Sequence, residues 1–212
     1  MFSIQSPNRP SFSESLRLLL DRRFMTIFLL GFSSGFPWVL HGSVLTLWMQ
    51  ESGLSRSSIG YVGAVATVYA INWMWAPFID KLKLPVLHRM FGQRRSWILL
   101  CQAIIILAVL GMSQANPSSS LSIVSLMALI IALASATQDI SVDAYRITLF
   151  SKAEMDDKIS FSAAVATAGW YSGYAFIGGA LALWLGSDTV GLSWPQVYIS
   201  LAILVFLLMV LV

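Results

Sequence analysis

Residues 135–146 read S-A-T-Q-D-I-S-V-D-A-Y-R and interrupt an otherwise apolar stretch that begins near Leu121. Asp139 and Asp143 are four residues apart, so a helix would place both carboxylates on one face. Arg146 follows Asp143 by three residues and can reach it from the next turn. Ionisable side chains in a membrane helix are costly, and they mark a transport pathway or a structural contact. The segment therefore predicts a buried helix with a special role for its carboxylates.

The composition places the chain in the membrane. Of its 212 residues 57% are hydrophobic and only 11% are charged, whereas soluble domains carry roughly 25% charged residues. The single cysteine, Cys101, excludes a disulfide within the chain. The sequence contains neither a Cys/His spacing typical of a metal site nor a Walker A motif, so we expect no metal, no other cofactor and no ATPase activity. The basic residues within 80–96 indicate the orientation of the chain in the membrane rather than nucleic-acid binding.

Six apolar segments predict an all-α integral membrane protein with a six-transmembrane-helix bundle. Each is close to the ~20 residues that a helix needs to cross the bilayer. The segments lie at about 24–48, 58–79, 97–114, 121–145, 160–185 and 195–212. A polar cytoplasmic segment, 1–23, precedes this 24–212 bundle, and an S-x-x-E capping motif at Ser11 predicts a short interfacial helix through about Asp21.

The basic residues predict the orientation. Twelve lysines and arginines lie on one side of the six segments and only Arg56 lies on the other. Because positively charged loops stay cytoplasmic, both termini and the loops at 80–96 and 146–158 are predicted to be cytoplasmic. The chain ends inside the sixth apolar segment, so we interpret it as an N-terminal half. The second bundle would be missing or supplied by another chain.

Four motifs resemble the AmpG family of muropeptide permeases in the major facilitator superfamily. They are G-F-S-S-G-F-P at 31–37, W-A-P-F-I-D at 75–80, F-G-Q-R-R-S-W at 91–97 and S-A-T-Q-D-I-S-V-D-A-Y at 135–145. The resemblance implies one half of a major facilitator fold, although members of the family normally have at least twelve helices. It also implies proton-driven import of GlcNAc-anhydroMurNAc peptides across the bacterial cytoplasmic (inner) membrane, in peptidoglycan recycling and beta-lactamase induction. The acetyl-CoA transporter family shares parts of the pattern, so a different bulky anion stays an alternative, as does a non-transporting half-length membrane subunit.

The charged residues allow a structural interpretation. A helix rises about 1.5 Å per residue, which places Asp139 about 12 Å and Asp143 about 18 Å to the cytoplasmic side of the midplane. At that depth Asp143 can pair with Arg146, or with Arg94 or Arg95 of the 80–96 loop, while Asp80 anchors the other end. The residues of this predicted cytoplasmic latch are Asp80, Arg94, Arg95, Asp143 and Arg146.

A proton-coupling or gating role is the competing interpretation. Asp139 lies one turn deeper than Asp143, where water is scarcer, and protonatable carboxyls of this kind serve as proton relays. His41 is a second candidate because imidazole ordinarily titrates near neutral pH, although a histidine that only bonds a backbone carbonyl fits equally well. The candidates for coupling or gating are Asp139, Asp143, Arg146 and His41.

Residues of the first apolar segment, 24–48, and of neighbouring segments predict a substrate site. Gly31, Gly35 and Pro37 predict a break near Phe36, and interrupted helices at the midplane point to a transport site. Aromatic side chains suit the apolar faces of sugar rings, although an interfacial aromatic belt is the alternative. The predicted substrate-binding residues are Ser34, Gly35, Trp38, Tyr69, Asn72, Gln138, Trp170 and Tyr174.

Overall fold

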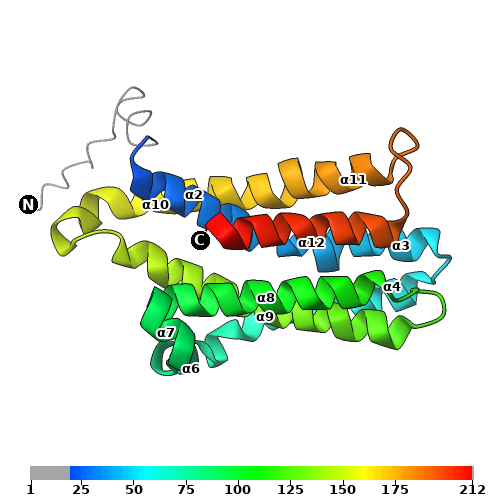
Figure 1. The fold of residues 1–212 in the computed structure, drawn as a ribbon, viewed down its shortest axis with the longest axis horizontal. Coiled ribbons are helices and arrows are strands. Elements are labelled where there is room, and N and C mark those ends of the chain that lie inside the picture. Colours follow the sequence, from blue (N-terminus) through cyan, green and yellow to red (C-terminus); the bar gives the residue numbers. More distant parts are fainter. Residues whose placement is uncertain (1–19, 212) are drawn as a thin grey trace, which may run out of the picture.

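The computed structural model describes residues 20–211, which form an elongated bundle of helices aligned with its long axis (Figure 1). Every regular element in this part of the chain is helical. The interfacial helix that the sequence predicts lies largely outside the described residues. In chain order the elements are α2 (Arg22–Gly35), η1 (Val39–Ser43), α3 (Val44–Glu51), α4 (Arg56–Gly63), η2 (Ala64–Thr67), α5 (Val68–Ile71), η3 (Asn72–Met74), α6 (Ala76–Lys81), α7 (Pro85–Phe91), α8 (Gln93–Ser113), α9 (Leu121–Thr148), α10 (Lys152–Tyr171), η4 (Ser172–Gly179), α11 (Ala180–Gly186) and α12 (Trp194–Leu211).

All six apolar segments predicted from the sequence are helical. Within the described residues, four helices are long and apolar enough to cross a membrane: Arg22–Glu51, Gln93–Ser113, Leu121–Thr148 and Trp194–Leu211. The segment at 58–79 is divided among α4, η2, α5, η3 and α6, and the segment at 160–185 contains the π-helix η4. The structure is therefore a membrane helical bundle with four clear candidate spans, and the count of six spans stays a prediction.

The predicted break in the first apolar segment is present. Helix α2 ends at Gly35 and is followed by the π-helix η1, in which Gly42 has non-helical dihedral angles of φ −103° and ψ −105°. The main distortion thus lies at Gly42, about six residues beyond the position near Phe36 that the sequence predicted. The hydroxyl of Tyr198 on α12 donates to the carbonyl of Leu40 at 2.7 Å, which gives the distorted backbone a partner in the bundle interior.

Helix α2 crosses α10 and η4 through glycines. A methyl group added to Gly35 would lie 2.1 Å from the carbonyl oxygen of Trp170, and one added to Gly173 would lie 2.2 Å from that of Phe32. Gly31 and Gly169 make equally close approaches, which gives each side of the crossing a G-x-x-x-G pair on one face. The two backbones therefore touch directly, which fixes the position of Ser34 relative to Trp170.

The main apolar core lies among the first, third, fourth and sixth apolar segments. Its largest fully buried side chains include Phe36, Leu45, Met112, Ile131 and Leu201. Large apolar side chains are also exposed on the outer surface, among them Leu107 on α8, Leu126 on α9 and Ile203 on α12. Apolar side chains on both the inside and the outside are what a bundle in hydrocarbon requires.

The glycine crossing gives the first prediction. Gly35→Ala forces a methyl group against a backbone carbonyl, so we expect it to lower the free energy of unfolding by about 1–3 kcal/mol. Gly60 on α4 is the matched control because nothing lies within 4 Å of the added methyl group. Urea unfolding in detergent measures both variants, and equal stability of the two would contradict the crossing.

Candidate functional site

An open cavity of about 330 Å³ lies among α2, α9 and α10. It brings together two of the predicted coupling carboxylates and two of the predicted binding residues. Its lining residues are Gly31, Ser34, Asp139, Val142, Asp143, Ala166, Thr167, Trp170 and Tyr171. Asp139 and Asp143 thus share one face of α9, as their spacing predicts, and that face opens into the cavity.

The two carboxylates have different surroundings. Asp139 is partly buried and accepts a hydrogen bond from the hydroxyl of Ser34 on α2. The side chain of Asp143 is 69% exposed, and its Oδ1 lies 3.4 Å from Nη2 of Arg146. Asp139 therefore has a neutral partner on another helix, whereas Asp143 has a cationic partner on its own helix.

Arg146 extends the contact of Asp143 to the next helix. Its Nη1 donates to the hydroxyl of Ser162 on α10 at 3.4 Å. Of the three partners that the sequence left open for Asp143, the structure shows Arg146. The contact joins the end of α9 to α10, and its exposure limits what it adds to stability, because exposed ion pairs contribute about 0–1 kcal/mol.

The other predicted latch residues form a separate contact. Arg94 at the start of α8 pairs with Asp80 near the end of α6. The guanidinium carbon of Arg95 lies 6.0 Å from the centre of the Phe91 ring. The pair of Arg94 and Asp80 closes the loop between the second and third apolar segments. The role of these residues as a cytoplasmic latch stays a prediction.

Buried amides connect α2 to α8 and α9. Nε2 of Gln138 donates to the carbonyl of Ser33 at 3.0 Å and to its hydroxyl at 3.1 Å. Gln102 on α8 donates to the same hydroxyl. Gln138 is completely buried and is not among the cavity-lining residues. Ser33 and Gln102 were not predicted from the sequence, although an amide in the apolar segment at 97–114 was a signal for this contact.

The predicted aromatic residues form one cluster. Trp38 lies 4.4 Å from Tyr69 and 5.9 Å from Trp170, measured between ring centroids. Trp170 in turn lies 5.2 Å from Tyr174. The cluster therefore joins the first, second and fifth apolar segments, and only Trp170 among these four rings lines the cavity.

His41 and Asn72 lie at the edge of this cluster. Nε2 of His41 is 3.1 Å from the hydroxyl of Tyr69, so its partner there is a phenol on the second apolar segment. His41 is 3% exposed, which removes it from water on both sides of the bundle. Asn72 is partly buried in η3, one turn beyond Tyr69, and does not line the cavity.

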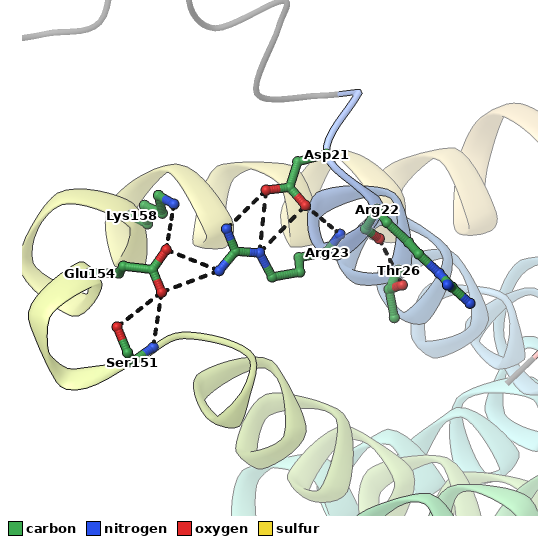
Figure 2. Close-up of polar contacts among 7 residues, drawn as sticks. All are labelled: Asp21, Arg22, Arg23, Thr26, Ser151, Glu154 and Lys158. Carbon is green, nitrogen blue, oxygen red and sulfur yellow. Dashed lines mark hydrogen bonds and ion pairs between the residues drawn. The ribbon is translucent and has the colours of Figure 1, made fainter.

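A network of charged residues joins α2 to α10 at the end of the bundle where both begin, as Figure 2 shows. The guanidinium of Arg23 lies 3.0 Å from Asp21 and 3.0 Å from Glu154. Glu154 also accepts from Lys158 at 2.7 Å and from the backbone and hydroxyl of Ser151, which completes a capping box. From the sequence, Arg23 and Lys158 were recognised only as two of the twelve basic residues that predict the orientation.

These contacts lower the pKa of both carboxyls in the network. Hydrogen bonds from Lys158, from the Ser151 backbone and from Arg23 lower the pKa of Glu154 from 4.5 to about 2. Hydrogen bonds from the Arg23 side chain and backbone lower the pKa of Asp21. Both groups are therefore ionised at neutral pH and hold the network together by charge.

The chain is similar in sequence to several transporters. AmpG 4 of Rickettsia felis is 34% identical over 188 residues, which cover 89% of this chain and 44% of the relative. The anhydromuropeptide permease of Escherichia coli K12 is 31% identical over 192 residues, covering 91% of this chain and 37% of the permease. AmpG 1 of Rickettsia bellii is 28% identical over 192 residues, covering 91% of this chain and 45% of the relative. The resemblance to the AmpG family is confirmed. The chain spans less than half the length of these relatives. No family model matches the chain.

The low pKa of Glu154 gives the second prediction. A carboxyl whose folded-state pKa is depressed adds stability above its unfolded pKa, and that stability is lost as pH falls through the folded value. We expect Glu154→Gln to destabilise the protein at pH 6–7, with the difference in stability shrinking as pH falls from about 4.5 towards 2. Unfolding curves at low salt over this range measure the effect, and a difference that does not depend on pH would contradict the ionic network.

Proposed function

We propose that these residues form one six-span bundle of a secondary transporter that carries cell-wall muropeptides across the bacterial inner membrane. The observation that carries the proposal is the cavity, which combines Asp139, Ser34 and Trp170 in a chain that resembles AmpG permeases along about 90% of its length. The relatives are named as transporters and a permease, which supports a role in transport rather than in catalysis.

The proposed orientation places both termini in the cytoplasm. In Figure 1 the start of α2, helix α7 and the start of α10 lie at one end of the bundle. The basic residues of the 80–96 and 146–158 loops belong to this end, and Arg56 at the start of α4 lies in the loop on the other side. The positive-inside rule therefore supports a cytoplasmic segment at 1–23 followed by a membrane bundle at 24–212.

The cavity suits one part of a large substrate. Its volume lies near the lower limit of ligand sites, which are about 300–1,000 Å³. Trp170 offers an aromatic face for a sugar ring. The Ser34 hydroxyl can donate or accept hydrogen bonds with polar groups of the sugar, and the carboxylates can accept them. A disaccharide peptide is larger than this cavity. In the proposed transporter, a second bundle, from the remaining length seen in the relatives or from another chain, would enclose the rest.

Proton coupling and import are part of the proposal. Asp139 lines the cavity, has a hydroxyl partner on α2, and has a second carboxylate one turn away. Neutralising or ionising Asp139 changes its bond with Ser34, which links α9 to α2. A proton gradient directed into the cell would then favour inward transport of the substrate.

The alternative of a CoA ester receives less support from the cavity. Coenzyme A carries phosphates, which proteins bind with arginine, lysine or helix N-termini. None of the nine described residues that line the cavity is basic, and two of them are aspartates. The chemistry of the cavity thus favours a substrate with hydroxyl and amide groups.

The third prediction tests the transport function itself. The whole gene product that carries these residues should take up labelled anhydromuropeptide in cells that lack their own permease. Trp170→Ala should weaken apparent affinity about two- to tenfold, the loss expected for one aromatic contact. Trp184→Ala on α11 is the matched control because this ring is 57% exposed and lies away from the cavity. No uptake, or equal losses in both variants at equal protein levels, would contradict the proposal.

The fourth prediction separates the two carboxylates. Asp139→Asn keeps an acceptor for the Ser34 hydroxyl, so we expect folded protein in normal amounts and uptake that no longer responds to a pH gradient. Asp143→Asn removes the charge of an exposed carboxylate and keeps an oxygen that can accept from Arg146, so we expect retained pH response and a stability change of about 0–1 kcal/mol. Uptake at several external pH values measures both. A full pH response in Asp139→Asn would exclude this residue as the coupling group.

A further inference from the structure

Exposed apolar side chains lie on η3, on α6, on α7 and in the turn between α6 and α7. Trp73 and Phe78 are each 69% exposed, and Leu82 in the turn is 56% exposed. On α7, Val86 and Met90 are 71% and 68% exposed and lie one turn apart, so they share a face. We call these five residues the α7 surface. It lies at the end of the bundle where α8 begins (Figure 1).

Basic side chains border the α7 surface. Lys81, Lys83 and Arg89 are exposed, and within the described part of the chain none of them forms an ion pair. The nearby carboxylate of Asp80 is already paired with Arg94. The surface therefore combines exposed apolar side chains with uncompensated positive charge.

The rest of the chain holds this surface in place. Nε2 of Gln93 donates to the carbonyls of Ile79 at 3.0 Å and Leu82 at 2.8 Å. Nε1 of Trp97 also donates to the carbonyl of Leu82, at 3.0 Å. These bonds fix the turn between α6 and α7 against α8. The exposure of Val86 and Met90 is thus a feature of a defined structure and not of a loose loop.

We propose that the α7 surface binds anionic phospholipids in the membrane leaflet at this end of the bundle. Val86 and Met90 enter the boundary between headgroups and acyl chains, where an amphipathic helix buries its apolar face. Lys81, Lys83 and Arg89 then meet the phosphates of the headgroups, since basic residues beside a membrane attract anionic lipids.

Two observations favour lipid over a protein partner. Ile71 and Met74, which precede α6 in the second apolar segment, are exposed apolar side chains as well, so exposed apolar residues extend into a segment expected to lie in the membrane. The three unpaired cations that border the α7 surface match the negative charge of a lipid surface, whereas a protein partner would have to supply both an apolar face and several carboxylates. The inference does not depend on the transport function, because it concerns only how the bundle meets the membrane.

The fifth prediction uses a fluorescent label on the α7 surface. Bimane is attached at Met90→Cys in a Cys101→Ala background, and the protein is placed in nanodiscs. The discs contain phosphatidylglycerol or phosphatidylcholine with the same nitroxide near the headgroup end of one acyl chain. We expect both lipids to quench the label. Quenching by the phosphatidylglycerol should exceed quenching by the phosphatidylcholine at least about fivefold, which is the effect that one basic residue near an anionic surface would have alone.

Two controls complete the experiment. Lys81→Gln/Lys83→Gln/Arg89→Gln should abolish the preference, whereas Arg22→Gln/Arg56→Gln/Lys152→Gln removes equal charge elsewhere and should retain it. A label at Asp188→Cys, in the exposed loop before α12, should show no preference. Equal quenching by the two lipids would overturn the proposal, as would an unquenched label at position 90, the result expected if water or protein covers this surface.

Discussion

The contact between the backbones of α2 and α10–η4 is the constraint on which the cavity depends. In hydrocarbon, helices gain nothing from hiding apolar side chains from lipid, so close van der Waals packing and interhelical hydrogen bonds hold them together. Glycines on both helices allow the Trp170 carbonyl to lie where a side chain on Gly35 would otherwise be. This packing fixes one wall of the cavity, and Ser34 reaches across from it to Asp139 on α9. A larger residue in the crossing would therefore displace the polar contacts as well as the helices.

The two carboxylates of α9 show why one segment supported two interpretations. Asp143 has the exposed, charge-paired surroundings of a structural contact, and Asp139 has the deeper position and hydroxyl partner that suit a protonatable group. Helical geometry makes this division possible, because one turn changes the depth by about 6 Å while keeping the same face. The structural and coupling interpretations thus apply to different residues of the same motif, and both roles stay predictions.

The features that could be predicted from the sequence are those that depend on local patterns of residues. The helical segments, the break after α2, and the reach of Arg146 to Asp143 all depend on residues within a few turns of one another. Contacts between distant residues were missed, such as Arg23 with Glu154, because a charge near a helix end has the same sequence pattern whether it marks topology or bonds a partner. The division of residues 58–79 into short helices was also missed, since apolar composition and length do not report the regularity of the backbone.

Helix α2 is held to α10 and to α9 by contacts of different kinds. Helices α2 and α10 are joined twice, by the glycine crossing and by the network around Arg23. Helix α9 meets α2 through two polar links, from Gln138 to Ser33 and from Ser34 to Asp139. The first link is completely buried and has no ionisable member, so it does not change with pH. The second faces the cavity and includes a carboxyl. If protons act on this bundle through α9, as proposed, the bond between Ser34 and Asp139 is the one of these two links between α9 and α2 that a proton can alter directly.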